Sequence, residues 1–117
     1  MSSLTIIATM NDGTNQVNKT KTAAITTAGE GIDYRVVPVT TSEYTFTIDT
    51  DIGDAGYCMI INNDATNFVE VGFATTVYPL KVLAGQPAVF PLAAATAALY
   101  LKADTATCNV QVYVHEA

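Results

Sequence analysis

YTFTID, residues Tyr44–Asp49, alternates apolar and polar side chains without a break. Because successive side chains of a strand point to opposite faces of its sheet, this period of two predicts a strand with one buried face and one wet face. Leu99–Asp104 and Cys108–His115 alternate in the same way, and the second run places Cys108 and three valines on the face expected to be buried. Together the three runs predict a β-protein built around a shared apolar core.

Short stretches rich in Gly, Asn and Asp separate further strand-like segments, as is typical of turns between antiparallel strands. These segments are Leu4–Thr9, Tyr34–Thr40, Tyr57–Ile61, Phe68–Phe73 and Val77–Leu83. The turn candidates are Asn11–Gly13, Ala28–Gly31, Asp51–Gly56, Asn62–Asn67 and Ala84–Pro87. Eight to nine short strands at this spacing predict an all-β fold, an antiparallel β-sandwich or barrel.

The chain has 117 residues, half of them hydrophobic and 14% charged, which predicts one folded domain over residues 1–117. Residues 11–31 are rich in Asn, Thr and Lys, and we expect them to form an extended arm or a long hairpin. The Ala-rich stretch Leu92–Leu101 could form two turns of helix after Pro91, but an irregular connection is the favoured interpretation.

The formal net charge of −6 argues against nucleic acid or an anionic membrane as the main partner. Lys19 and Lys21 are too sparse for a nucleic-acid patch. Twenty uncharged residues between Lys81 and Lys102 match the length of a bilayer span, but their Pro, Gly and Ala content predicts that they do not insert. The start of the chain lacks the basic and apolar regions of a signal peptide.

The most metal-like segment is Asp49–Asp54, which concentrates carboxylates in a short loop. A calcium loop would need glycine at its sixth position and a carboxylate at its twelfth, whereas here glycine is fifth and Ile60 is twelfth. A turn capped by aspartate is therefore the favoured interpretation, and the same holds for Asn62–Asn67. We expect no metal and no cofactor.

Catalytic signatures are also missing from the sequence. His115 is the single histidine and lies two residues from the last residue, and neither a GxSxG elbow nor a glycine-rich phosphate loop occurs. The sequence therefore predicts a protein that is not an enzyme. Cys58 and Cys108 could form a disulfide, but without a secretion signal two buried free thiols are favoured.

The second half of the chain resembles small all-β virion proteins of tailed bacteriophages. The resemblance covers roughly residues 34–117, and the segments that carry it are Gly56–Gly72, Leu80–Gln86, Phe90–Leu92 and Leu99–Ala106. It implies an antiparallel β-sandwich of jelly-roll-like character and the role of a capsid decoration (cement) protein that stabilises the assembled head. It further implies a homo-oligomer, expected to be a trimer, bound to the major capsid protein on the capsid surface after synthesis in the host cytoplasm. The first forty residues do not share the resemblance and could form a capsid-binding arm.

Two alternatives remain open from the sequence. One is a tail, baseplate or fibre-attachment component, which is equally structural. The other is a carbohydrate-binding module on the same fold, for which exposed aromatic residues would have to stack on sugars. The candidates for that role are Tyr78, Tyr100 and Tyr113.

Overall fold

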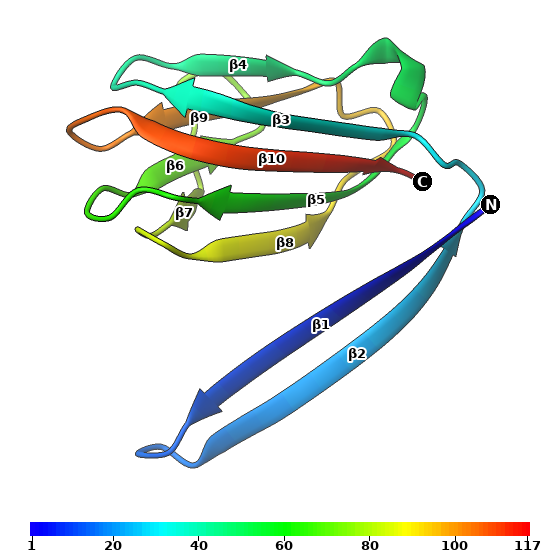
Figure 1. Ribbon diagram of the computed structural model, residues 1–117, viewed down its shortest axis with the longest axis horizontal. Coiled ribbons are helices and arrows are strands. Elements are labelled where there is room, and N and C mark those ends of the chain that lie inside the picture. The colour runs from blue at the N-terminus through cyan, green and yellow to red at the C-terminus, as the bar shows by residue number, and fades with distance from the viewer.

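The computed structural model describes all 117 residues. Figure 1 shows two four-stranded sheets packed face to face and a two-stranded hairpin that projects from one end of them. The expected all-β antiparallel sandwich is thus confirmed. The strands are β1 (Ser2–Asp12), β2 (Val17–Thr27), β3 (Ile32–Val39), β4 (Tyr44–Thr47), β5 (Ala55–Asn62), β6 (Val69–Gly72), β7 (Leu80–Val82), β8 (Pro87–Pro91), β9 (Ala98–Ala103) and β10 (Cys108–Glu116), with a short 3-10 helix at Thr50–Ile52.

The strand order of the sandwich is that of a jelly roll. One sheet has the order β3-β10-β5-β8 and the other β4-β9-β6-β7, and every pair is antiparallel. Only the β6–β7 connection joins neighbours of one sheet, and all other connections cross from one sheet to the other. Eight strands that wind in this way form the double-sheet jelly roll. Seven of the eight sandwich strands match expected segments, the expected strand Leu4–Thr9 lies in β1 of the arm, and β2 and β8 were not expected.

The core lies between the two sheets and consists of the inward-facing residues of both. Phe46, Leu99 and Leu101 are fully buried from one sheet, and Ile60 and the β10 valines from the other. Each of these side chains contributes about 1.5–3 kcal/mol by leaving water. The faces that the alternation predicted to be buried in β4, β9 and β10 are the buried faces. The period of two therefore assigned the core correctly in these strands.

The N-terminal hairpin is longer than expected and its turn lies elsewhere. The sequence placed a tight turn at Asn11–Gly13, but β1 continues to Asp12 and the chain turns between Gly13 and Gln16. Asp12 Oδ1 accepts hydrogen bonds from the amides of Thr14 and Asn15, at 3.0 and 3.3 Å, and the positive φ falls on Gln16 rather than Gly13. The projecting arm therefore spans residues 2–27, not 11–31.

Two further strand assignments need correction. β8 was missed because Pro87 and Pro91 read as turn residues, but β8 is an edge strand, where proline is tolerated. The strand expected over Val77–Leu83 is only β7, because Thr76 adopts a left-handed φ of 61° and turns the chain just before it. Residues 92–97 form no helix, in agreement with the irregular connection that was favoured.

Candidate docking surface

The outer face of the β3-β10-β5-β8 sheet is apolar, although it is turned away from the core. The strand registers align its residues in three rows of four. Antiparallel sheets normally present polar residues on a solvent-facing side, and an apolar second face indicates that something covers it. We call this surface the apolar face. Its rows are Ile32, His115, Tyr57 and Pro91, then Tyr34, Tyr113, Met59 and Val89, and finally Val36, Gln111, Ile61 and Pro87.

The outer face of the other sheet provides an internal comparison. Its middle row places Glu70 of β6 directly between Lys102 of β9 and Lys81 of β7. Opposite charges on neighbouring strands stabilise a solvated sheet surface. Thr45, Thr47 and Tyr100 continue this polar face. The outer face of the β4-β9-β6-β7 sheet thus carries charged and hydroxyl groups, whereas the outer face of the β3-β10-β5-β8 sheet is apolar.

Several large apolar side chains on the apolar face are exposed to solvent. Ile32, Tyr34, Val36 and Val89 each expose between 44% and 60% of their surface. Single exposed apolar residues are common in proteins and need no explanation. Here the exposed residues of the edge strands β3 and β8 continue into half-buried residues of β10 and β5, and a contiguous apolar surface of this kind is typical of an interaction site.

A stacked tyrosine pair forms the centre of this face. The rings of Tyr34 and Tyr113 lie 4.3 Å apart between centroids and 10° from parallel. Gln111 Nε2 donates to both hydroxyl groups, at 3.1 Å to Tyr34 and 3.3 Å to Tyr113. Partial burial and the hydrogen bond with Tyr34 raise the pKa of Tyr113, so its hydroxyl is protonated at pH 7. The pair is an aromatic platform held in place by Gln111.

The arm has one apolar side and one threonine-rich side. Opposite residues of an antiparallel pair share a face, so the register places Leu4 with Ile25 and Ile6 with Ala23. These four residues are half-buried, whereas their neighbours on the other side of the arm are exposed. Further out, Ala8 lies opposite Lys21 and Met10 opposite Lys19 on the same apolar side.

A groove of about 370 Å³ lies between the base of the arm and the apolar face. Apolar side chains make up most of its wall. Leu4 and Ile6 line it from the arm, and Ile32, Tyr57, Met59 and Val89 line it from the sheet.

The angle of the arm is fixed at its root by the end of the chain. The Gly29 amide donates to the Ala117 carbonyl at 2.8 Å, and the Gly31 amide donates to Glu116 Oε2 at 2.9 Å. The N-terminal ammonium group lies 2.6 Å from Glu30 Oε1. Figure 1 shows the result, because the arm leaves the sandwich beside the C-terminus and its tip points away from both sheets.

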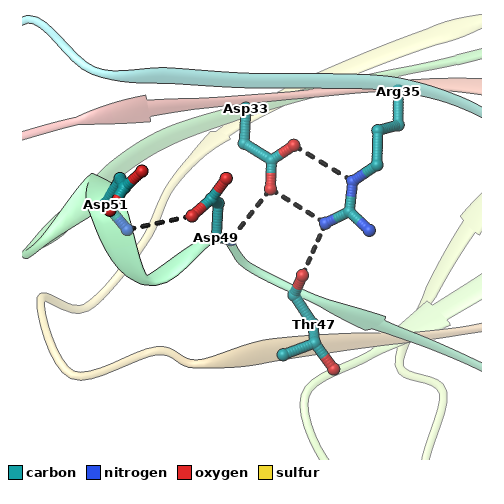
Figure 2. A network of polar contacts seen from close by, with 5 residues as sticks. All are labelled: Asp33, Arg35, Thr47, Asp49 and Asp51. Carbon is teal, nitrogen blue, oxygen red and sulfur yellow. Dashed lines mark hydrogen bonds and ion pairs between the residues drawn. The ribbon is translucent and has the colours of Figure 1, made fainter.

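A polar network closes the sandwich at the β3–β4 edge (Figure 2). Asp33 accepts from Arg35 Nε at 3.0 Å and from Arg35 Nη2 at 2.8 Å, and the Asp49 amide donates to Asp33 Oδ2 at 2.9 Å. The Arg35 guanidinium also donates to the Thr47 carbonyl and stacks 3.7 Å above the Phe46 ring. Burial raises the pKa of Asp33, but the hydrogen bonds and the charge of Arg35 outweigh it, and the pKa lies below its usual range.

The loops considered for metal binding are turns capped by side chains. Asp49 Oδ1 accepts from the Asp51 amide at 3.0 Å, and Asp64 Oδ2 accepts from the amides of Thr66 and Asn67, at 3.0 and 2.6 Å. These bonds are the turn capping that was favoured. No group of three or more His, Cys, Asp or Glu side chains is arranged to hold a metal ion.

Cys58 and Cys108 are both free and buried. Cys58 lies opposite Val114 of β10, six residues along that strand from Cys108. At about 3.4 Å per residue this separation far exceeds the Cα distance of about 7 Å that a disulfide can span. Burial raises the pKa of Cys58 to about 12 and also raises that of Cys108, so both stay protonated.

The remaining candidate residues do not come together. His115 Nδ1 lies 2.6 Å from the Glu116 carbonyl oxygen. Tyr78 donates to Glu43 Oε1 at 2.6 Å, while Tyr100 and Tyr113 lie on the outer faces of opposite sheets. The three tyrosines therefore do not form one sugar-stacking platform.

Sequence reasoning missed the apolar face as a unit and the Asp33–Arg35 pair. Both could be found from the alternation in β3, where Asp33 and Arg35 share the inward side with two valines while Ile32, Tyr34 and Val36 share the outer side.

None of the helical segments is long or apolar enough to cross a bilayer. Comparison with protein-family models, with curated proteins and with solved structures finds no match.

Proposed function

We propose that this chain is a non-enzymatic structural protein of a bacteriophage virion, a decoration protein that binds the outside of the assembled head. The observation that carries the proposal is the pairing of an apolar outer sheet face with a rigidly rooted, projecting arm. These two surfaces are suited to binding other proteins, which is the task of a structural protein in an assembly. The resemblance of residues 34–117 to small phage virion proteins supports the same assignment.

A decoration protein has to bind the assembled head tightly enough to stabilise it. A protein that binds only the assembled lattice stabilises that lattice by mass action. Lasting attachment needs an interface above about 1,000 Å² with good packing. The apolar face and the arm offer exposed apolar surface for contacts among copies and with the shell, and the net charge of −6 disfavours binding to nucleic acid.

Cryo-electron microscopy of the purified particles, combined with quantitative protein staining, tests the proposal. A decoration protein is expected in hundreds of copies as density outside the capsid shell. A few dozen copies or fewer at the tail would instead identify the protein as a tail, baseplate or fibre-attachment component. Absence from the particle would contradict both structural roles.

A binding assay supplies a second test that does not depend on imaging. Heads that lack this protein are mixed with the purified chain and sedimented, and bound protein is measured. We expect saturable binding to assembled heads and none to unassembled capsid subunits. Binding to glycans, with none to heads, would favour the carbohydrate-binding module.

A further inference from the structure

We infer that the apolar face receives the arm of a neighbouring copy of the same chain, so that the copies are joined by arm exchange. This inference goes beyond the proposed function and does not depend on it. It concerns which surfaces of this chain meet. Four independent observations lead to it.

The first observation is that the outer half of the arm lacks a partner, since only its base lines the groove beside the sheet. Outside its root, the arm is a two-stranded hairpin, and such a hairpin is only marginally stable in water unless it gains a third strand or an apolar surface to pack on. Its apolar side carries Leu4, Ile6, Ala23 and Ile25, with Met10 near the tip. The apolar face is the complementary surface, since only the part of it beside the groove meets the chain's own arm.

The second observation is the size of the unpaired surface. The molecule exposes 6899 Å², whereas a compact monomer of 12.3 kDa is expected to expose about 6,100 Å². The radius of gyration is 14.9 Å, against about 13 Å expected for 117 residues. The excess of about 800 Å² equals what one partner contributes to a standard protein–protein interface.

The third observation is charge complementarity between the arm and the rest of the chain. Residues 1–27 carry two lysines and one aspartate, a net charge of +1, whereas residues 28–117 carry three cationic and ten acidic side chains, a net charge of −7. Acidic residues also rim both ends of the β3-β10-β5-β8 sheet. Asp54 and Glu116 lie at the end nearer the arm root, and Asp64 and Asp104 lie at the other end. Lys19 and Lys21 of an incoming arm would therefore approach negative charge at either end.

The fourth observation is geometry. The root fixes the arm so that its tip points away from its own sandwich (Figure 1). Eleven residues at about 3.3 Å each make β1 about 36 Å long. This length is enough to cross the whole of a neighbouring sheet. The outer half of the arm is thus placed to reach a second copy, while the base of the arm lines the groove beside its own apolar face.

Arm exchange makes a contact between two different surfaces, which generates a closed ring or an open filament rather than a two-fold dimer. Each subunit offers one arm and one apolar face. A ring of three would pair each arm with the apolar face of a neighbour, and the remaining exposed surface of the ring would then be what meets the head.

The test begins with the intact chain in sedimentation equilibrium across a range of concentrations. Ile6→Glu places a charge on the apolar side of the arm, and Thr5→Glu places the same charge on its opposite side. Met59→Glu and Val36→Glu disrupt the apolar face, and Thr45→Glu is the matched change on the polar face. Thermal unfolding of each variant checks that the sandwich still folds.

We expect the wild-type chain to self-associate and the three disruptive variants to weaken association at least about tenfold. Thr5→Glu and Thr45→Glu are expected to change it by less than about twofold. A wild-type chain that stays monomeric up to about 1 mM would overturn the inference. So would an Ile6→Glu chain that associates like the wild type, because the contact would then join two apolar faces without the arm.

A mixture of two variants gives the decisive test. Ile6→Glu keeps an intact apolar face and Met59→Glu keeps an intact arm, so an equimolar mixture contains one functional arm–face pair. We expect the mixture to form a heterodimer although neither variant associates alone. Failure of the mixture to associate would overturn arm exchange, and association of the mixture would support it even if one variant alone were partly destabilised.

Discussion

At the residue scale, the buried amide of Asn62 organises one end of the sandwich. Its Nδ2 donates to the Asn67 carbonyl at 2.9 Å and to the Val82 carbonyl at 3.2 Å, and its Oδ1 accepts from the Asp64 amide at 3.0 Å. The side chain is completely buried, so no water can replace these partners. One residue thus ties β5 to the following loop and to β7.

Asn62→Ala is expected to lower the free energy of unfolding by about 2–4 kcal/mol, because it leaves buried polar backbone groups without partners. Urea unfolding monitored by tyrosine fluorescence measures the change. Asn63→Ala is the matched control, since Asn63 is exposed, and it should cost less than about 0.5 kcal/mol. Equal effects of the two substitutions would contradict the role assigned to Asn62.

The Asp33–Arg35 pair predicts a pH dependence of stability. The pKa of Asp33 is lower in the folded chain than its unfolded value of about 3.9. Asp33 therefore contributes its full stabilisation above pH 4, and this contribution is lost as the pH falls through the folded pKa. Acid should therefore weaken the hydrogen bonds that Asp33 of β3 accepts from Arg35 and from the Asp49 amide after β4.

Asp33→Asn is expected to cost about 2 kcal/mol at pH 7, because Arg35 loses a charged hydrogen-bond partner. The difference from wild type should narrow progressively below pH 4, where the wild-type carboxylate also becomes protonated. Denaturant unfolding at pH 7, 4 and 2.5 measures this trend. A difference that stays constant over the range would show that the charge of Asp33 does not matter.

At the scale of the elements, the β6–β7 hairpin depends on a close backbone approach at Gly72. A Cβ atom at this position would lie 1.7 Å from the Val77 carbonyl oxygen. The clash is with backbone rather than with a flexible side chain, so the hairpin would have to move. Tyr78 just beyond this point donates to Glu43, and that bond, together with minor burial, raises the pKa of Tyr78 to about 12.

Gly72→Ala is expected to destabilise the protein by about 2 kcal/mol, within the range of overpacking substitutions. Gly13→Ala is the control, since a Cβ there meets nothing within 4 Å and its φ is not positive. It should change stability by less than about 0.5 kcal/mol. Thermal unfolding of the two variants compares them directly, and equal melting temperatures would contradict the expected clash.

At the scale of the whole molecule, the chain is divided into a weakly positive arm and a strongly negative sandwich. If copies associate through arm exchange, attraction between these parts adds to the apolar contact. Exposed charges are screened over about 8 Å at physiological ionic strength. The electrostatic share of the association should therefore fall as salt is added, while the apolar share persists.

The double variant Lys19→Gln with Lys21→Gln is expected to weaken self-association about threefold to tenfold at low salt and to have little effect at 1 M NaCl. Lys81→Gln with Lys102→Gln changes the net charge equally but lies on the polar face, so association should stay close to wild type. Analytical ultracentrifugation at both salt concentrations measures the effects. Equal weakening by the two pairs would mean that only net charge matters.

Features that depend on a short segment alone could be predicted from the sequence, whereas features that depend on strand pairing could not. The alternation in Tyr44–Asp49 and Cys108–His115 predicted strands and buried faces correctly, since the period of two needs no information beyond the segment itself. The tight turn at Asn11–Gly13 was wrong because the pairing of two long strands, rather than the turn residues, decides where a hairpin ends. β8 was missed because its prolines are acceptable only at a sheet edge, which is a property of the assembled sheet.

The sequence by itself determined that this chain is an all-β protein with a shared apolar core, because alternating branched and aromatic residues bury one face of each strand. Tertiary structure decided the rest. In β5 both faces are apolar, and in β3 the charged residues Asp33 and Arg35 lie on the inward side, so local pattern cannot tell which face turns inward. Strand order settles that question, because pairing with β10 and β8 places Val37 and Ile60 inside and leaves Tyr34 and Met59 outside. The docking face is therefore a product of long-range pairing, even though every residue in it is visible in the sequence.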